Sequence, residues 1–172
     1  DFDKERQVAA LLLQSCVDGL AVIAPRRIQA EEIAYLRNTG VPVSYFLRNL
    51  PAEDIDAFVS CNYDASYQLT TYLIEKGCRN FSFVTMSKER QTTYDRLSGG
   101  VQALKDNGIK YDFTKTSYAP PTVSGGYIAV ANLLERDVSF DACVCFCDLQ
   151  AVGAIETLKK YGRRIPEDVQ VT

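Results

Sequence analysis

The sequence predicts an α/β fold with mostly parallel sheets, and three observations support this prediction. Short apolar runs alternate with longer segments in which apolar residues recur every three or four positions, as expected of strands and helices. The short runs are apolar almost throughout, which is typical of strands buried on both faces. Several longer segments stop at a glycine, the residue that most readily adopts the left-handed conformation after a helix. Because parallel strands need crossover connections, we expect the helices to link the strands through right-handed crossovers.

Seven segments are expected to form strands, since each is apolar and bounded by turn or charged residues. They are residues 20–25, 42–47, 57–61, 80–85, 115–119, 142–147 and 169–172. The helices between them are expected at residues 3–15, 28–39, 65–76, 92–107, 124–136 and 149–161. Glycines stand at or just past four of the helix ends, at Gly40, Gly77, Gly108 and Gly162. The chain opens on a helix without a preceding strand and stops within a strand, so we expect an architecture truncated at both ends.

The composition indicates a folded domain without catalytic machinery. The 172 residues are 47% hydrophobic and 24% charged, close to the globular average. Lys and Arg number 19 against 22 Asp and Glu, a net charge of −3, whereas DNA-binding surfaces usually carry a cationic excess. Histidine is absent, which excludes Ser-His-Asp and Cys-His catalytic units and histidine metal sites. We therefore expect no enzyme activity, no metal and no cofactor.

The cysteines and the chain start favour a cytoplasmic protein. The sequence has no apolar run long enough to span a bilayer, and its acidic start does not resemble a signal peptide. The six cysteines lack the CxxC spacing of zinc or redox sites, so reduced thiols are the simplest interpretation. Cys143, Cys145 and Cys147 alternate along an expected strand at steps of about 6.5–7 Å, too far apart for one zinc ion. We expect them to be small buried hydrophobic residues.

Three charged residues are candidate ligand contacts. Arg96 offers a rigid fork of donors that suits hydroxyls or a carboxylate, although a surface pairing with Asp95 is the simpler alternative. Asp64 and Asp148 each lie between an expected strand and helix, at the sheet edge where α/β proteins bind ligands. The alternative is that each carboxylate only caps its helix.

Tyrosines and glycines in the same regions have simpler alternatives as well. Tyr63, Tyr94, Tyr118 and Tyr127 lie near expected strand ends or helix starts, where their rings could cover a sugar or a purine, but packing is the commoner role. Gly99-Gly100 falls inside a helical pattern rather than in a strand-to-helix turn, so we expect close helix packing there rather than phosphate binding.

Five segments in order resemble the effector-binding region of the lactose-repressor and galactose-repressor (LacI/GalR) family of bacterial transcription regulators. Each motif alone is weak, but their order along nearly the whole chain is specific. The segments are Cys16-Val17-Asp18-Gly19-Leu20, Asn62-Tyr63-Asp64 leading to Glu75-Lys76-Gly77, Arg96-Leu97-Ser98-Gly99, Cys147-Asp148-Leu149-Gln150-Ala151-Val152-Gly153-Ala154 and Gly162-Arg163-Arg164-Ile165-Pro166-Glu167-Asp168-Val169.

The resemblance implies two Rossmann-like lobes of the periplasmic-binding-protein type, with a small molecule bound between them. We expect an incomplete N-terminal lobe over residues 1–77 and an incomplete C-terminal lobe over residues 78–172, with the exchange at Lys76-Gly77-Cys78-Arg79-Asn80. Closure of the lobes would be transmitted to a helix-turn-helix domain outside this chain. That domain would bind operator DNA and carry the positive charge that this chain lacks. A homodimer is expected, with Ile33 and Leu36 as candidate contacts, unless both side chains face the sheet.

The resemblance also assigns the effector contacts. Arg96 and Asp148 match the arginine and aspartate that hydrogen-bond the effector in this family. Asp64 matches the family's acid at the start of the helix that ends here in Glu75-Lys76-Gly77. We expect Asp64 on one lobe and Arg96 and Asp148 on the other, with Tyr63 and Tyr118 completing the site. The family's usual Asn and Asp are replaced by Cys147 and Cys61. The effector class expected is a sugar or related polar metabolite.

Two other functions remain open from the sequence. A periplasmic sugar-binding protein of a transport system shares this fold, but the six unpaired thiols and the Ile165–Val169 motif disfavour it. A nucleotide-dependent enzyme of the doubly wound class is weaker still, because the chain has neither a GxGxxG fingerprint nor a phosphate loop. A regulator with no membrane association is therefore the favoured interpretation.

Overall fold

The computed structural model describes residues 2–23, 30–46, 56–87 and 90–172, which form two compact units. The first unit is Asp1–Ser60 and the second is Cys61–Thr172. The boundary expected at residues 77 and 78 is therefore wrong. Helix α3 (Asn62–Glu75) packs along α4 (Gln91–Asp106), so it belongs with the second unit.

The turn expected to separate the lobes is an ordinary helix end inside the second unit. Gly77 N donates to Ile74 O at 3.0 Å and Cys78 N donates to Leu73 O at 3.1 Å, which closes the last turn of α3. Gly77 has a φ of +99°, the left-handed conformation that favours glycine. The glycine stop was predicted correctly, but it does not mark a change of unit.

The first unit is a small parallel sheet with two helices. Its strands β1 (Leu20–Val22), β2 (Val43–Phe46) and β3 (Asp56–Phe58) pair in the order β1-β2-β3. Helices α1 (Phe2–Gln14) and α2 (Ala30–Arg37) both contribute to its core, which contains Leu20, Ile33, Leu36 and Tyr45. Parts of the strands expected at residues 20–25 and 42–47, and of the helix expected at 28–39, lie outside the described residues.

The dimer contact expected on α2 is not supported. Ile33 and Leu36 are 5% and 9% exposed and pack against Leu20 and Tyr45 of their own unit. Their spacing of three residues places them on the face of α2 that covers the sheet. This agrees with the alternative stated from the sequence, that both side chains face the sheet. Neither side chain is accessible to a second copy.

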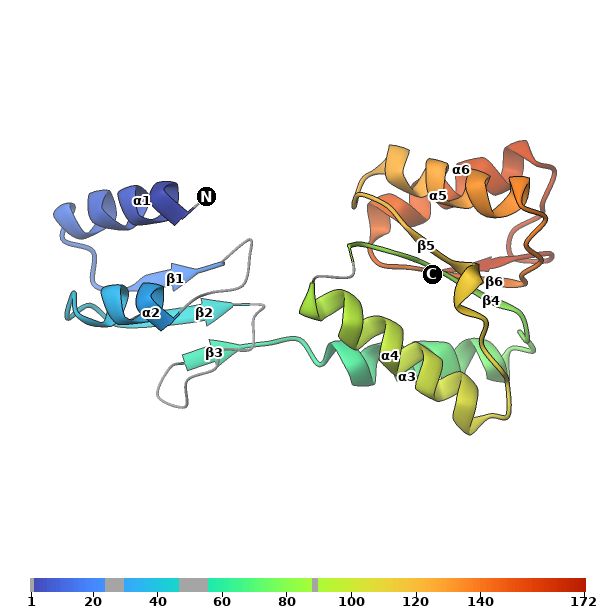
Figure 1. The fold of residues 1–172 in the computed structure, drawn as a ribbon, viewed down its shortest axis with the longest axis horizontal. Helices are drawn as coiled ribbons and strands as arrows, with labels where there is room; N and C mark the ends of the chain where they lie inside the picture. The colour runs from blue at the N-terminus through green and yellow to red at the C-terminus, as the bar shows by residue number, and fades with distance from the viewer. Residues whose placement is uncertain (1, 24–29, 47–55, 88–89) are drawn as a thin grey trace. The chain divides into compact units, whose positions relative to one another are not determined.

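The second unit has three layers. Strands β4 (Phe81–Thr85), β5 (Thr116–Tyr118), β6 (Ala142–Cys145) and β7 (Gln170–Val171) form a parallel sheet in the order β5-β4-β6-β7. Helices α3 and α4 cover one face, and α5 (Val123–Glu135) and α6 (Asp148–Lys160) cover the other (Figure 1). A short 3-10 helix at Phe113–Lys115, which the sequence did not predict, precedes β5.

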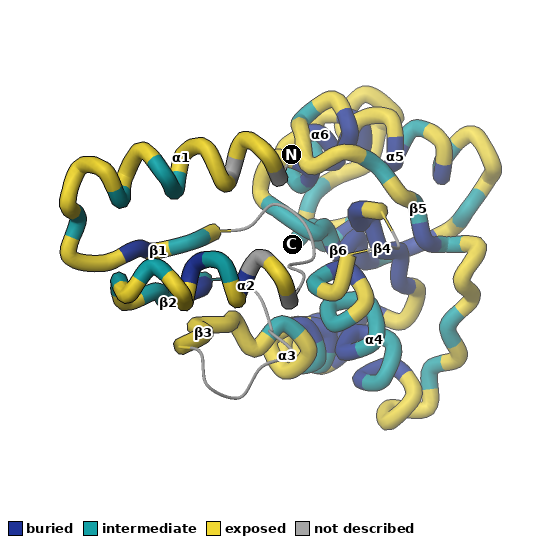
Figure 2. The backbone as a smooth tube through the Cα atoms, turned by 60° about the vertical axis from the view of Figure 1, so that its left-hand side comes forward, coloured by how far each residue is buried: buried dark blue, intermediate teal, exposed yellow. Residues whose placement is uncertain are grey.

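Each face of this sheet has its own core. Leu73, Phe81, Phe83 and Leu104 are among the buried residues on the α3 and α4 side. Val84, Val130, Leu133, Cys143 and Leu158 are among those on the α5 and α6 side. The buried stretches of β4 and β6 run through the middle of the unit in Figure 2. All five residues of β4 are buried, as the near-continuous apolar pattern predicted.

Each expected strand and helix has a counterpart among the described elements, and the sheets are parallel as predicted. Gly40, Gly77, Gly108 and Gly162 all have φ between +71° and +99°, which confirms their role after helices. No helix within the described ranges is long and apolar enough to cross a membrane.

The cysteine strand differs from the expectation at its end. β6 stops at Cys145, so Cys147 is not a strand residue but precedes α6. Cys143 is fully buried in the core, as predicted, and its Sγ lies 3.9 Å from that of Cys145. All six cysteines are free thiols, and each of them lies in the described part of the chain.

Candidate functional site

All five residues expected at the effector site lie in the second unit, near the carboxyl ends of its strands. Tyr63 and Asp64 are in the first turn of α3, Arg96 is in the second turn of α4, Tyr118 ends β5 and Asp148 begins α6. This is the edge at which open α/β sheets bind ligands. The expectation that Asp64 sits on the opposite lobe from Arg96 and Asp148 is wrong, because α3 packs on α4.

Arg96 joins three elements at this edge. Its Nε donates to Asn62 Oδ1 at 2.8 Å, which connects α4 to the start of α3. Its Nη1 donates to the carbonyl oxygen of Phe146, in the connection from β6 to α6. The guanidinium also lies over the Phe146 ring, 4.4 Å from the ring centroid. The fork is therefore held in place before any ligand arrives.

The simpler alternative for Arg96, a pairing with Asp95, is not observed. The Asp95 carboxylate instead accepts a 2.8 Å hydrogen bond from Gln91 Nε2. Arg96 is only partly buried, and its two hydrogen bonds leave further guanidinium N–H groups free to donate. Those groups can bind ligand hydroxyls or a carboxylate.

Asp148 is the first residue of α6 rather than its cap. The cap position is Cys147, whose φ of −152° and ψ of 163° are extended, and its side chain makes no capping hydrogen bond. The Asp148 carboxylate is exposed and favoured by the positive end of the helix dipole. Within the described ranges it has no hydrogen-bond partner, so it can accept from a ligand.

Asp64 departs from the capping expectation in the same way. Helix α3 begins two residues earlier, at Asn62, and its cap is Cys61, again without a side-chain hydrogen bond. Asp64 therefore lies in the first turn, exposed to solvent. The two departures noted in the sequence, Cys61 and Cys147, thus fall on the caps of the two helices that carry the candidate acids.

Gly99 brings Tyr63 to the site by letting α4 touch α3. A Cβ at Gly99 would lie 2.2 Å from the carbonyl oxygen of Tyr63, so only glycine fits. A Cβ at Gly100 would lie 2.6 Å from the Phe83 ring. The prediction of close helix packing at these glycines is confirmed. The Tyr63 side chain remains 41% exposed.

Tyr118 lines a pocket at the carboxyl ends of β4 and β5. This pocket of about 660 Å³ is within the size range of small-molecule sites. Its lining residues follow β4 and β5, and they are Met86, Ser87, Arg90, Tyr118, Ala119, Pro120 and Pro121. Sequence reasoning missed all of these except Tyr118. The Pro-Pro pair directly after a strand was the available signal, since it marks a fixed connection at the ligand-binding edge.

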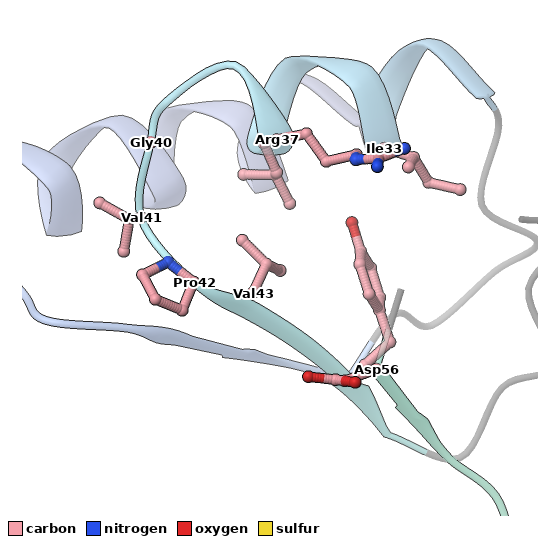
Figure 3. Close-up of a pocket in the computed structure, with 9 residues that line it drawn as sticks. Ile33, Arg37, Gly40, Val41, Pro42, Val43 and Asp56 are labelled. Carbon is pink, nitrogen blue, oxygen red and sulfur yellow. The ribbon is translucent and has the colours of Figure 1, made fainter. Parts of the chain in front are cut away.

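A second pocket lies in the first unit, between α2 and β2, and none of the expected site residues lines it. Figure 3 shows Val41, Pro42 and Val43 along one side, with the Arg37 side chain extending beside Ile33. It encloses about 380 Å³ and its lining is largely aliphatic. No motif in the sequence predicts this pocket, because it forms only when the helix packs on the strand.

The thiols of Cys143 and Cys145, both in β6, contact each other. The hydrogen bond with Cys143 and burial both raise the pKa of Cys145, so it stays protonated. The described residues contain no cluster of three or more His, Cys, Asp or Glu that could hold a metal ion.

Comparison with known proteins decides the family. A family model described as periplasmic binding proteins and the sugar-binding domain of the LacI family matches residues 1–172. The chain belongs to this family. The prediction of the family, made from the five ordered motifs, is confirmed.

The relatives of this LacI-family chain are transcriptional regulators. It is 35% identical over 157 residues to the HTH-type transcriptional regulator CelR of Thermobifida fusca. The matched residues cover 90% of this chain and 46% of CelR. A solved structure titled as a transcriptional regulator CelR-cellobiose complex matches 96% of this chain and 51% of that chain, with a TM-score of 0.83 and 32% identity. The crystal structure of the Escherichia coli transcriptional repressor AscG matches 99% of this chain and 62% of that chain, with a TM-score of 0.84 and 28% identity.

The chain spans about half the length of the curated relatives it matches. Their names describe transcriptional regulators. The comparisons match the LacI-family effector-binding part, and the fold prediction of a periplasmic-binding-protein-like α/β region is confirmed.

Proposed function

We propose that this chain is the effector-binding region of a bacterial DNA-binding transcriptional regulator, and that its effector is a sugar or a related polar metabolite. The observation that carries the proposal is the Arg96 junction. One guanidinium, fixed by Asn62 and Phe146, presents further donors at the carboxyl edge of the sheet, and Phe146 lies two residues before Asp148, the first residue of α6. Fixed donors and a carboxylate that has no hydrogen-bond partner within the described ranges suit vicinal hydroxyl groups, which both donate and accept hydrogen bonds.

The roles of the residues follow from their chemistry. Arg96 donates to effector oxygens, while Asp148 and Asp64 accept from effector hydroxyls. Tyr63 and Tyr118 offer exposed rings to the apolar face of a sugar. Hydrogen bonds to charged groups contribute roughly 1.5–3 kcal/mol each, so losing one of them should weaken binding about tenfold or more.

Regulation requires that the effector prefers one conformation. A ligand shifts an equilibrium only by its different affinities for the two states. Ligand-driven lobe closure, coupled to a helix-turn-helix that binds operator DNA, is part of this proposal. A homodimer in the cytoplasm is also part of it, and light scattering on the purified regulator tests the dimer.

Cellobiose is the first effector to test, because the CelR structure was solved with it. Cys61 and Cys147 replace polar family residues near the site, so the preferred sugar need not be the same. The alternative of a periplasmic sugar-binding protein would bind a sugar equally well, but the named relatives are transcriptional regulators.

A thermal-shift screen tests the proposal. The chain is heated with cellobiose, other sugars, sugar phosphates and purines, because a specific ligand raises the melting temperature by mass action. The same compounds are then tested on Arg96→Ala and Asp148→Ala. We expect one sugar class to stabilise the unsubstituted chain and to lose most of its effect on both variants. A stabilising compound that works equally well on both variants would show that the site is elsewhere.

A further inference from the structure

A fully buried amide, that of Gln150, connects two parts of the second unit at the candidate site. Gln150 is the third residue of α6, two positions after Asp148, and its side chain is 0% exposed. Its Nε2 donates hydrogen bonds of 3.0 Å to the carbonyl oxygens of Ala119 and Pro120. Both acceptors line the pocket beside Tyr118. One side chain therefore joins the start of α6 to the wall of that pocket.

The segment that Gln150 contacts, residues 119–122, has few donors of its own. Pro120 and Pro121 have no backbone N–H, so they cannot be held by donating hydrogen bonds. Ala119 N donates to Thr85 O and Thr122 N donates to Pro120 O, both at 2.8 Å. The amide of Gln150 supplies the donors from outside the segment, which anchors it to α6.

Glycines bring the surrounding backbones into direct contact. A Cβ at Gly126 would lie 2.1 Å from Gln150 O, and one at Gly125 would lie 2.1 Å from Pro120 O. A Cβ at Gly153 would lie 2.0 Å from Val123 O. The first turn of α5, the first turns of α6 and segment 119–122 thus pack backbone against backbone. A shift of one requires a shift of the others.

The Gln150 side chain combines a stabilising feature, its two donated hydrogen bonds, with a destabilising one. Gln150 Oε1 is buried and has no hydrogen-bond partner among the residues that the structure describes, which is unfavourable for folding. Methionine has a similar length and would remove that unpaired oxygen, but it would also remove both donated hydrogen bonds. The Gln150→Met substitution therefore removes the link to segment 119–122 while keeping most of the side-chain volume.

We propose that Gln150 is a positioning residue of the effector site, which fixes segment 119–122 and Tyr118 relative to Asp148. This inference rests on the proposed function. Gln150 does not contact the effector itself; it holds the Tyr118 ring and the Asp148 carboxylate at a constant separation, so that one effector meets both. Loss of the amide loosens the segment and weakens binding without unfolding the unit.

The first measurement needs no effector. The chain has no tryptophan, so Pro121→Trp places a single fluorophore at an exposed position of the segment. We expect Gln150→Met in this background to raise the acrylamide quenching constant about twofold, because the segment opens locally more often. The matched control is Gln102→Met, which removes a 2.7 Å hydrogen bond to Asp106 on α4. Equal quenching in Gln150→Met and in the control would overturn the proposal.

The second measurement is the affinity for cellobiose by calorimetry on the 172-residue chain without the tryptophan. We expect Gln150→Met to weaken binding about tenfold and Gln102→Met to leave it unchanged. Gln150→Asn, whose shorter amide cannot reach both carbonyls, is expected to behave like Gln150→Met and replaces it if that variant does not fold. Unchanged affinity alongside raised quenching would overturn the role in the effector site. If cellobiose and the other sugars fail to bind the unsubstituted chain, the proposed function fails, while the quenching result still decides the positioning role.

Discussion

Arg96 Nε and Asn62 Oδ1 lie 2.8 Å apart and join the second turn of α4 to the first turn of α3. Asn62 is 34 residues before Arg96 in the chain, so the bond is a tertiary contact. Because the same guanidinium also donates to Phe146 O, it organises the start of α3 and the approach to α6 together.

Arg96→Lys should weaken both stability and sugar binding. A lysine ammonium cannot reproduce the planar fork that reaches two acceptors and lies over a ring. We expect the free energy of unfolding to fall by about 1–3 kcal/mol, since the Phe146 carbonyl loses its charged partner. Urea unfolding followed by circular dichroism measures this loss. Arg163→Lys, at an exposed position, is the control, and an equal effect of the two substitutions would contradict the role of Arg96.

Gly99→Ala should destabilise the second unit although alanine favours helices. The added methyl group would sit 2.2 Å from the Tyr63 carbonyl oxygen, so α3 and α4 must separate. We expect a loss of about 1–3 kcal/mol after allowing for the helix propensity of alanine. Gly19→Ala, whose Cβ would be 3.5 Å from Pro42 O, is expected to be nearly neutral. A stable Gly99→Ala variant in the same thermal melt would show that the two helices are not held at this contact.

Cys147→Ser should stabilise the protein. Cys147 has the extended backbone of a helix cap but makes no capping hydrogen bond, and a serine hydroxyl can accept from the free N–H groups of α6. The expected gain is about 0.5–2 kcal/mol by chemical denaturation. At Cys61 the backbone is not extended, with φ −72° and ψ 64°, so Cys61→Ser should gain less. The reverse order of the two gains would contradict this account.

The Arg164 and Asp168 pair predicts a pH effect in the acid range. The hydrogen bond from Arg164, at 2.5 Å from Nη2, lowers the pKa of Asp168 to about 2. Because the folded-state pKa lies below the unfolded value, the contribution to stability is present above about pH 4 and is lost as the pH falls toward 2. Carboxyl titration by NMR should show this pKa rising toward its ordinary value in Arg164→Ala. An unchanged pKa in that variant would contradict the assigned cause.

Local patterns were enough to predict the order of strands and helices. Apolar runs and glycine stops depend on neighbouring residues, which is why β4 and the left-handed turns at Gly77 and Gly108 were predicted correctly. The unit boundary is not local. The end of α3 looks like any helix end, and only its packing on α4 through Gly99 assigns it to the second unit.

The candidate site was predicted as residues but not as an arrangement. The order of the motifs suggested Arg96 and Asp148 as candidates, but the two acceptors of Arg96, Asn62 and Phe146, come from distant parts of the sequence. Cysteine is not a usual helix cap, so neither Cys61 nor Cys147 indicated where its helix begins. The cap of α3 was therefore expected three residues too late, at Asp64, and the cap of α6 one residue too late, at Asp148. The pocket at Tyr118 depends on two connections that only tertiary structure brings together.

The most direct test of the effector site is an NMR titration of the isotope-labelled chain with cellobiose, or with the sugar that gives the largest thermal shift. The account predicts that the largest amide shifts fall at residues 62–64, around Arg96 and Tyr118, and at residues 146–148. Shifts confined to the first-unit pocket beside Arg37 and Val43, with the second-unit edge unchanged, would contradict it.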